Sequence, residues 1–268
     1  MVDPQAAGRA RILAVANQKG GVGKTTTAIN LGTALAAVGR SVLIVDLDPQ
    51  GNASTGLGIG MAQRRHNSYQ VLIGAESAGE AATPTVIPRL DLMPSAPELS
   101  GAELELIEMK SPQLRLRQAL RALPAKYDYV LIDCPPSLNL VTVNAMAAAD
   151  AVLVPLQCEF FALEGLSQLL NTIERVRASL NPKLEIQGIV LTMFDRRNRL
   201  SEQVADDVRT HMGAKVYETV IPRNVRVSEA PSHGRPALLY DHRCAGSQAY
   251  IRLAGELLRR ERSRAVAA

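Results

Sequence analysis

The amino-acid sequence predicts an α/β fold in which a mostly parallel, twisted sheet is flanked by helices on both faces. Strand-length apolar runs, rich in branched side chains, alternate along the chain with longer segments of helical periodicity. Runs that are apolar without interruption are typical of strands covered on both faces, as in parallel sheets. In such sheets, ligands bind beyond the carboxyl ends of the strands.

The individual elements follow in order from this alternation. We expect strands at residues 12–16, 41–46, 90–94, 129–133, 151–155, 185–192 and 216–221. We expect helices at residues 25–38, 113–123, 140–149, 163–180 and 200–212, followed by an amphipathic segment at 247–262. The 268 residues are 47% hydrophobic, which suffices for one large core, and no repeat or linker divides them. We therefore predict a disordered arm at 1–10, a single domain at 11–262 and a frayed tail at 263–268.

Composition narrows the class of protein. The apolar runs are too short to span a membrane, and no signal-peptide core is visible near the first residue. The three cysteines (Cys134, Cys158 and Cys244) are widely separated, which suits a reducing cytosol and argues against disulfides or a zinc site.

A glycine-rich segment between the first expected strand and the first expected helix predicts a phosphate-binding loop. Its residues are Lys19, Gly20, Gly21, Val22, Gly23, Lys24, Thr25 and Thr26. The glycines let backbone N–H groups face a polyphosphate, and the following helix N-terminus adds partial positive charge. Lys24 can reach the β- and γ-phosphates, and the Thr25 hydroxyl can bind Mg²⁺. The fold is therefore expected to be of the P-loop NTPase type.

The loop departs from the usual spacing, because Gln18 stands where a glycine is expected and Lys19 adds a second lysine. A chance glycine-rich turn would not explain eight ordered positions between a strand and a helix.

Two aspartates follow the expected strand at 41–46. Carboxylates at a strand end beside a phosphate loop can hold Mg²⁺ through water or orient an attacking water. Asp48 is the better candidate for orienting the water, because it lies past the end of the strand. Asp46 is expected to brace the loop or the outer shell of the metal. A solvated strand end with a turn is the alternative.

The strand at 129–133 also ends in a carboxylate, Asp133, followed by Cys134, Pro135 and Pro136. A carboxylate in this position accepts hydrogen bonds from Mg²⁺-bound water in many nucleotide-binding sites. The two prolines fix the backbone and make a stiff turn that can transmit loss of the γ-phosphate to the next helix. Ordinary packing suffices to explain Cys134.

These three motifs, together with the segment at 221–236, resemble the ParA/Soj branch of the ParA/MinD group of ATPases. The resemblance extends from about residue 11 to about residue 259. It implies a weak ATPase that binds ATP and Mg²⁺, with Lys24 and Thr25 at the phosphates and metal, Asp48 positioning the water, and Asp48 and Asp133 near the metal through water. Catalysis is accordingly assigned to Lys19, Lys24 and Asp48.

The resemblance also implies partners. Lys19 is expected to reach the phosphates of a second subunit, so that ATP closes a homodimer, and Pro222 and Asn224 fall where relatives contact adenine. It further implies non-specific binding of double-stranded DNA, a ParB-like centromere-binding partner that stimulates hydrolysis, and a bacterial cytoplasmic, nucleoid-associated location.

The distribution of charge supports DNA binding independently of the motifs. Residues 1–192 carry 16 basic and 17 acidic side chains, whereas residues 193–268 carry 14 and 9. Arginines with few aromatic residues (3% of the chain) suggest phosphate contacts that ignore base sequence. The resemblance implies Arg197 and Arg226 as the main candidates, since relatives use basic residues for DNA binding at these positions, and Arg199 and Arg223 are added to them. The alternative is a solvated face whose arginines pair locally with Asp195, Asp206 or Glu229.

Two other functions remain open. A MinD-like ATPase would bind membranes through the amphipathic segment at 247–262, but this segment lacks Trp and Phe, and docking onto the core is favoured. A nitrogenase iron protein would need cysteines from two subunits to hold a cluster, and Cys134 and Cys158 lack the expected glycine-flanked context.

Overall fold

Seven strands form one sheet in the computed structural model, which describes residues 9–267. The strands are β1 (Arg11–Val15), β2 (Val42–Asp46), β3 (Thr83–Pro84), β4 (Leu90–Met93), β5 (Tyr129–Asp133), β6 (Ala151–Gln157) and β7 (Glu185–Thr192). Their order in the sheet is β3-β4-β2-β5-β1-β6-β7, and all neighbours are parallel except the antiparallel pair β3 and β4. The mostly parallel sheet expected from the apolar runs is confirmed.

Eleven helices accompany the sheet within the described residues. They are α1 (Lys24–Ala37), α2 (Asn52–Gly56), α3 (Ser68–Ile73), α4 (Ala102–Ile107), α5 (Arg115–Arg121), α6 (Leu140–Ala148), α7 (Ala162–Ser179), α8 (Arg199–Met212), α9 (Val225–Glu229), α10 (Ala237–Tyr240) and α11 (Ala245–Ala267). All five helices predicted from periodicity are present, and α5 is shorter than its predicted span. The short helices α2, α3, α4, α9 and α10 have too few turns to give a periodic signal.

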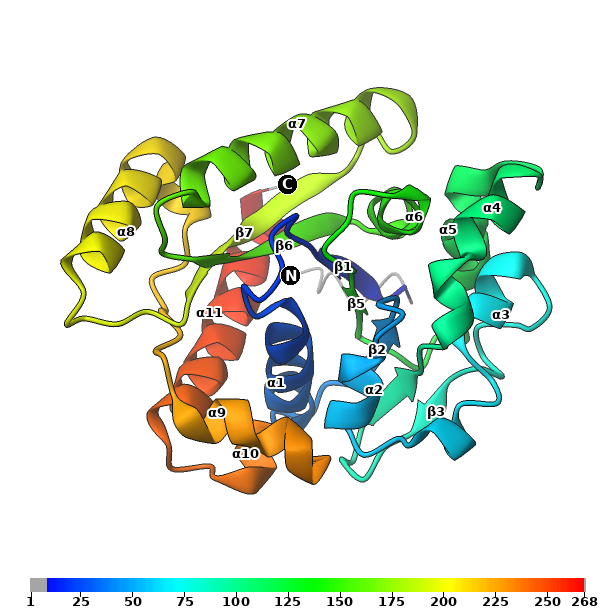
Figure 1. Ribbon diagram of the computed structural model, residues 1–268, viewed down its shortest axis with the longest axis horizontal. Coiled ribbons are helices and arrows are strands. Elements are labelled where there is room, and N and C mark those ends of the chain that lie inside the picture. Colours follow the sequence, from blue (N-terminus) through cyan, green and yellow to red (C-terminus); the bar gives the residue numbers. More distant parts are fainter. Residues whose placement is uncertain (1–8, 268) are drawn as a thin grey trace.

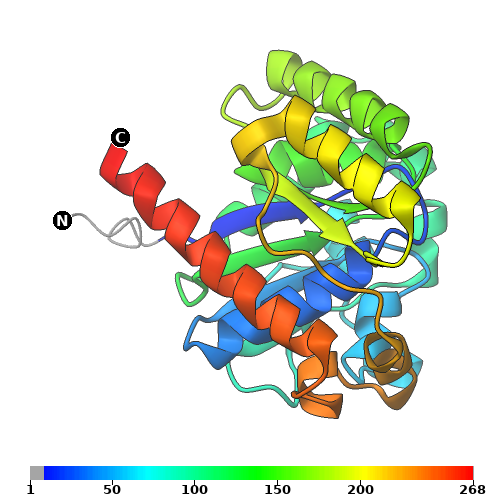
Figure 2. The same ribbon diagram turned by 90° about the vertical axis from the view of Figure 1, so that its left-hand side faces the viewer.

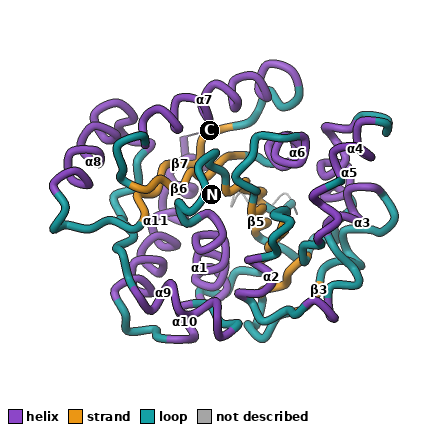
Figure 3. Tube along the Cα trace, in the orientation of Figure 1, coloured by secondary structure: helices purple, strands orange, loops and turns teal. Residues whose placement is uncertain are grey.

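Helices cover both faces of the sheet because successive strand residues point to opposite sides. Ile12 and Ala14 of β1 belong to one buried cluster, which includes residues of α6, α7 and α8. Leu13 and Val15 belong to the other cluster, which includes residues of α1 and α11. Figure 1 shows α6 and α7 on one side of the sheet and α1 and α11 on the other, and the same layers are visible in the trace of Figure 3.

The segment at 216–221 is not a strand, and this prediction was wrong. It touches β7 through an isolated bridge between Ile189 and Val216 and through the Tyr217 N–H, which donates to the Ile189 carbonyl at 2.8 Å. The N–H groups of Glu218 and Thr219 instead donate to the carboxylate of Glu256 on α11, each at 2.9 Å. A side chain thus takes the donors that a ladder would need.

The C-terminal helix α11 docks onto the core. Its apolar stripe is fully buried, with Tyr250, Leu253, Ala254 and Leu257 each at most 1% exposed. The Tyr250 hydroxyl lies 3.3 Å from the Thr27 hydroxyl of α1. Figure 2 shows α11 crossing one side of the molecule. The predicted docking is therefore confirmed, and the membrane-surface alternative loses its apolar face.

The predictions for the two ends of the chain can be compared with the structure only within the described residues. The helix continues through residues 263–267, where we expected a frayed tail, and residue 268 lies outside the described residues. Of the arm predicted at 1–10, residues 1–8 also lie outside them. Within residues 9–267, no helix has both the length and the apolar character needed to cross a bilayer.

Candidate functional site

The glycine-rich loop joins β1 to α1 at the carboxyl edge of the sheet. Gly21 and Gly23 have φ values of 73° and 85°, a left-handed conformation that favours glycine. Gly23 caps α1, which begins at Lys24. The Thr192 hydroxyl at the end of β7 donates to the Val22 carbonyl at 2.8 Å and ties the loop to the sheet. The backbone is therefore shaped as the phosphate-loop prediction requires.

Lys24 lies beneath this loop and is 6% exposed. Its ammonium donates to the carbonyl of Lys19 at 2.9 Å. Burial lowers the pKa of Lys24, against the raising influence of Asp133, Cys134 and Asp48. Among the described residues, the hydrogen-bond partner of this buried cation is a neutral carbonyl, so Lys24 is suited to take an anionic ligand in exchange.

Asp46 braces the loop that carries Asp48. Its carboxylate accepts hydrogen bonds from the Ser54 N–H (2.8 Å), the Ser54 hydroxyl (2.7 Å) and the Asp48 N–H (3.2 Å). Burial raises the pKa of Asp46 to about 6, against the lowering effect of these hydrogen bonds. The bracing role expected for Asp46 agrees with this geometry.

Hydrogen bonds fix the backbone of Asp48 and one of its carboxylate oxygens. The Ser95 hydroxyl donates to the Asp48 carbonyl, and the Asp48 carboxylate accepts from the Gln50 N–H at 3.0 Å. The other carboxylate oxygen accepts no hydrogen bond from the described residues, which leaves it able to accept one from a water.

Asp133 is the most unusual group in the site. It is fully buried, and among the described residues neither of its carboxylate oxygens has a hydrogen-bond partner. Burial raises its pKa well above the usual value, and the charges of Asp46 and Asp48 raise it further. The Thr25 hydroxyl favours the ionised form, although no hydrogen bond of normal geometry joins the two groups. An orphaned carboxylate of this kind indicates a missing cation or water.

The residues present fit a magnesium ion that is shared with a ligand. Within residues 9–267, no group of three His, Cys, Asp or Glu side chains is arranged to hold a metal alone. Thr25 and the orphaned Asp133 supply a hydroxyl and a carboxylate on one side, and Mg²⁺ commonly takes its other ligands from water and phosphates. A metal here therefore depends on a bound polyphosphate.

Lys19 is turned away from Lys24 and paired with a residue that the sequence analysis did not single out. Its ammonium contacts the carboxylate of Glu159, which follows β6. Its N–H donates to the Asn17 side-chain oxygen at 3.1 Å, and the Asn17 amide donates to the Pro155 carbonyl at 2.8 Å. Glu159 and Asn17 both follow strand ends, so the rule that pointed to Asp48 and Asp133 would also have pointed to them.

The two residues expected at the adenine lie in the segment after β7. Pro222 forms an isolated parallel bridge with Phe194. The Asn224 side chain caps α9 by accepting from the Val227 N–H at 3.3 Å. Because the Asn224 side chain is engaged in this cap, the predicted adenine contact would fall to backbone groups.

The arginine-bearing segments, far apart in sequence, lie side by side. The Phe194 N–H donates to the Ile221 carbonyl at 3.0 Å, and the Arg223 N–H donates to the Phe194 carbonyl at 3.1 Å. This pairing brings the exposed Arg197 and Arg199 close to the segment that carries Arg223 and Arg226.

Two of these arginines also form the local ion pairs of the alternative reading. Arg197 pairs with Asp195 at 2.9 Å, and Arg226 pairs with Glu229 at 3.1 Å. Arg197 lowers the pKa of Asp195 to about 2. Exposed pairs of this kind contribute little to stability because solvent screens them, so a phosphate can replace the carboxylate at little cost.

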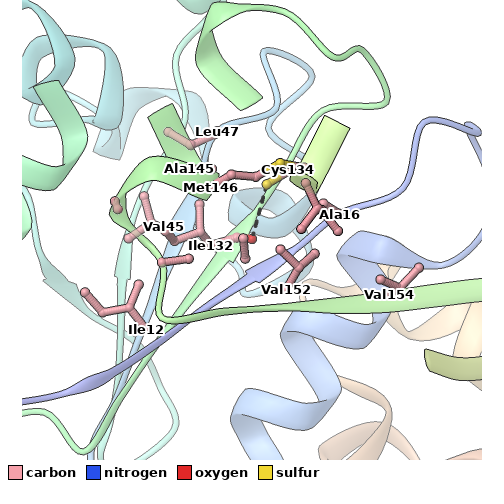
Figure 4. Packing of buried hydrophobic residues seen from close by; sticks show 14 of the residues in the cluster. Ile12, Ala16, Val45, Leu47, Ile132, Cys134, Ala145, Met146, Val152 and Val154 are labelled. Atoms are coloured by element: carbon pink, nitrogen blue, oxygen red, sulfur yellow. Dashed lines mark hydrogen bonds between the residues drawn. The ribbon is translucent and has the colours of Figure 1, made fainter. Parts of the chain in front are cut away.

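Two of the three cysteines lie in the interior, whereas Cys244 is partly exposed. Cys134 is 1% exposed and Cys158 is 4% exposed, both within the cluster under α6 and α7. Figure 4 shows Cys134 packed near Ala145 and Met146, with its thiol directed at the Ile132 carbonyl 3.7 Å away. Burial raises the pKa of Cys134 strongly. Neither of these thiols is placed to share a cluster with a second subunit, which argues against the iron-protein alternative.

Comparison with known proteins identifies the family. The family model described as an AAA domain matches residues 10–186. The chain is 68% identical to the chromosome partitioning protein ParA of Caulobacter vibrioides, covering 95% of this chain and 96% of that protein. It is 51% identical to the sporulation initiation inhibitor protein Soj of Bacillus subtilis, covering 92% and 98%. Among solved structures, cobyrinic acid a,c-diamide synthase from Mycobacterium smegmatis with bound ATP analog and magnesium is similar with a TM-score of 0.83 and 38% identity, covering 95% and 96%. The chain belongs to the ParA/Soj family of partitioning ATPases.

Proposed function

We propose that this protein binds ATP and Mg²⁺, closes a homodimer around them, coats DNA without regard to sequence and leaves it after hydrolysis. The observation that carries the proposal is a buried lysine in the glycine-rich loop, Lys24, within electrostatic reach of a buried carboxylate, Asp133, that has no hydrogen-bond partner among the described residues. The similar structure with an ATP analog and magnesium supports the choice of ligand.

Different residues bind the phosphates, hold the metal and orient the attacking water. Lys24 exchanges the Lys19 carbonyl for the β- and γ-phosphates, and the backbone N–H groups of residues 20–26 surround the phosphate chain. Thr25 and, through water, Asp48 and Asp133 would hold Mg²⁺, which supplies charge neutralisation when bound. The free oxygen of Asp48 orients the attacking water.

Dimerisation is assigned to Lys19. Two triphosphates facing one another repel, and a lysine from each subunit that reaches the other's phosphates offsets this repulsion. A cation supplied in trans can accelerate phosphoryl transfer by several powers of ten. Intrinsic turnover is expected to be slow, and a ParB-like centromere-binding partner is proposed to stimulate it. The protein would act on chromosomal or plasmid DNA in the bacterial cytoplasm, associated with the nucleoid.

The DNA surface is proposed to lie over the paired segments after β7. Dimerisation would place two copies of the surface formed by Arg197, Arg199, Arg223 and Arg226 on one assembly. If the dimer neutralises about six phosphates, the logarithm of the binding constant falls with the logarithm of salt concentration with a slope of about −5.

Light scattering after size exclusion tests the nucleotide switch. Asp48→Ala protein is expected to be a dimer with ATP and a monomer with ADP or without nucleotide, because it retains Lys24, Thr25 and Lys19. It is also expected to hydrolyse no ATP and to remain on plasmid DNA. Normal hydrolysis by Asp48→Ala would refute the role assigned to this carboxylate.

DNA retention with matched charge reversals tests the surface. Arg223→Glu is expected to lower DNA affinity and the steepness of the salt response. Arg175→Glu, an equally drastic change at an exposed position of α7, serves as the control and should leave both unchanged. A salt-independent affinity, or equal effects of the two variants, would exclude this surface.

A further inference from the structure

The loop between β6 and α7 combines an ion pair on Lys19 with two unusually exposed aromatic side chains. Glu159 contacts the Lys19 ammonium, and the next two residues are Phe160 and Phe161. Phe160 is 76% exposed and Phe161 is 62% exposed, although the chain has only three phenylalanines. Their rings meet edge to face with centroids 5.0 Å apart.

An adjacent phenylalanine pair in water is costly, because each ring withholds a large apolar area from burial. Isolated exposed apolar residues are common on protein surfaces, but clustered ones indicate a contact surface. The two rings meet edge to face and leave most of their area exposed. The loop is therefore built to be covered by something apolar.

A hollow lies directly beside the protruding rings. It has a volume of about 490 Å³ and is lined by Phe160 itself, Leu163 of α7, and Leu200 and Val204 of α8, with Asp206 and Asp207 on its polar side. A surface that meets its own copy about a two-fold axis must be complementary to itself, and a protrusion beside a hollow is one way to achieve this. This loop and its neighbours carry both.

The position of the loop indicates which partner covers it. The carboxyl ends of neighbouring parallel strands carry Asp133 as a last residue and are followed by Lys19, Asp48 and Glu159. The loop therefore shares an edge of the molecule with the nucleotide site. A second subunit that receives Lys19 must approach this edge. It would then meet the phenylalanine pair as well.

We propose that the loop of Glu159, Phe160 and Phe161 is a contact surface for a second copy of this chain, and that Glu159 holds Lys19 within its own subunit until that copy arrives. This inference rests on the proposed ATP-dependent dimer. In the separate subunit, the Glu159 carboxylate offsets the charge of Lys19. In the dimer, the triphosphate of the other subunit offsets the charge of Lys19 in place of Glu159, and the two rings pack against the partner.

The contact of Phe160 and Phe161 with a second copy is tested in the Asp48→Ala variant, where hydrolysis does not interfere. The dissociation constant of the dimer is measured with ATP by analytical ultracentrifugation. The double variant Phe160→Ser, Phe161→Ser is expected to weaken the dimer at least tenfold, since buried aromatic anchors carry much of the affinity of an interface. Binding of ADP to the monomer should stay within about twofold.

A matched control separates this surface from general loss of apolar area. Leu104 and Ile107 of α4 are 76% and 62% exposed, the same fractions as the two phenylalanines, and α4 lies on the opposite side of the molecule in Figure 1. The double variant Leu104→Ser, Ile107→Ser should leave the dimer unchanged. Equal weakening by both double variants, or by neither, would overturn the proposal.

Glu159→Gln tests the restraint on Lys19. Removing an exposed ion pair that exists only in the separate subunit should tighten the ATP dimer about two- to fivefold and leave the ADP form monomeric. An unchanged or weaker dimer would show that Glu159 does not restrain Lys19. Failure of Asp48→Ala itself to dimerise with ATP would instead refute the proposed function, and the two failures are thus distinguishable.

Discussion

Replacing Asp46 by asparagine is predicted to remove a loss of stability that the wild type suffers at this position as the pH rises. The native pKa of about 6 lies above the ordinary value of 3.8, because the carboxylate is fully buried. The native state therefore holds the proton more tightly than the unfolded state, and stability falls as the pH rises through this window. At about 1.4 kcal/mol for each pH unit, the total loss is about 3 kcal/mol, of which about 2 kcal/mol falls between pH 4.5 and 7.5.

Asparagine avoids this loss but breaks one hydrogen bond. Its oxygen can still accept both bonds from Ser54, while its amide group then faces the N–H of Asp48, donor against donor. This mismatch costs about 1–2 kcal/mol. Asp46→Asn should therefore be slightly less stable than the wild type at pH 4.5 and about 1–2 kcal/mol more stable at pH 7.5.

Urea unfolding of both proteins across this pH range, without nucleotide and with a chelator, measures the difference free of ligand effects. Asp195→Asn is an internal control that should show an almost constant free-energy difference over this range. Arg197 lowers the pKa of Asp195 from 3.8 to about 2, so the stability that this carboxylate contributes is lost only as the pH falls below about 4. A constant free-energy difference between wild type and Asp46→Asn from pH 4.5 to 7.5 would refute the argument, because it would mean that Asp46 does not titrate there.

The remaining predictions concern the loop and the last helix. Gly20→Val should fold and bind ATP normally, since no atom lies within 4 Å of the added Cβ, yet fail to form the ATP dimer as seen by light scattering. A dimer in that variant would mean that the loop does not approach a second subunit. Lys24→Ala should abolish binding of a fluorescent ATP analogue, and retained binding would contradict its assignment. Leu257→Ala should lower the free energy of unfolding by about 2–5 kcal/mol, because Leu257 is fully buried. Co-sedimentation of the wild type with anionic vesicles should show no binding; wild-type binding that Leu257→Ala abolishes would revive the membrane alternative.

Most of the layered fold was predictable because its signals are local. Six of the seven expected strands are present, and the alternation of apolar runs with periodic segments gave their order along the chain. The segment at 216–221 misled because its apolar residues are buried without a ladder, with Tyr217 packed inside and two neighbouring N–H groups bound to Glu256. Glu256 lies almost 40 residues further along the chain. A local sequence pattern therefore cannot show that its side chain binds these two N–H groups.

The candidate site was predictable where residues follow one another in the chain. The phosphate loop is contiguous, and the strand-end aspartates follow from the rule that the carboxyl ends of parallel strands share an edge. Glu159 was missed as the partner of Lys19, because 140 residues separate the two and only the neighbouring positions of β1 and β6 bring them together.

By itself, the sequence determined the family, the strand-and-helix order and the identity of the phosphate loop, since each depends on residues close together in the chain. Only the tertiary structure decided which charges meet. It buried Asp133 without a partner, set Lys19 against Glu159, and laid the arginines after β7 beside those near α9. The reason is physical: electrostatic and hydrogen-bond energies depend on distance and burial in space, and these are fixed only when the strands have been ordered into a sheet.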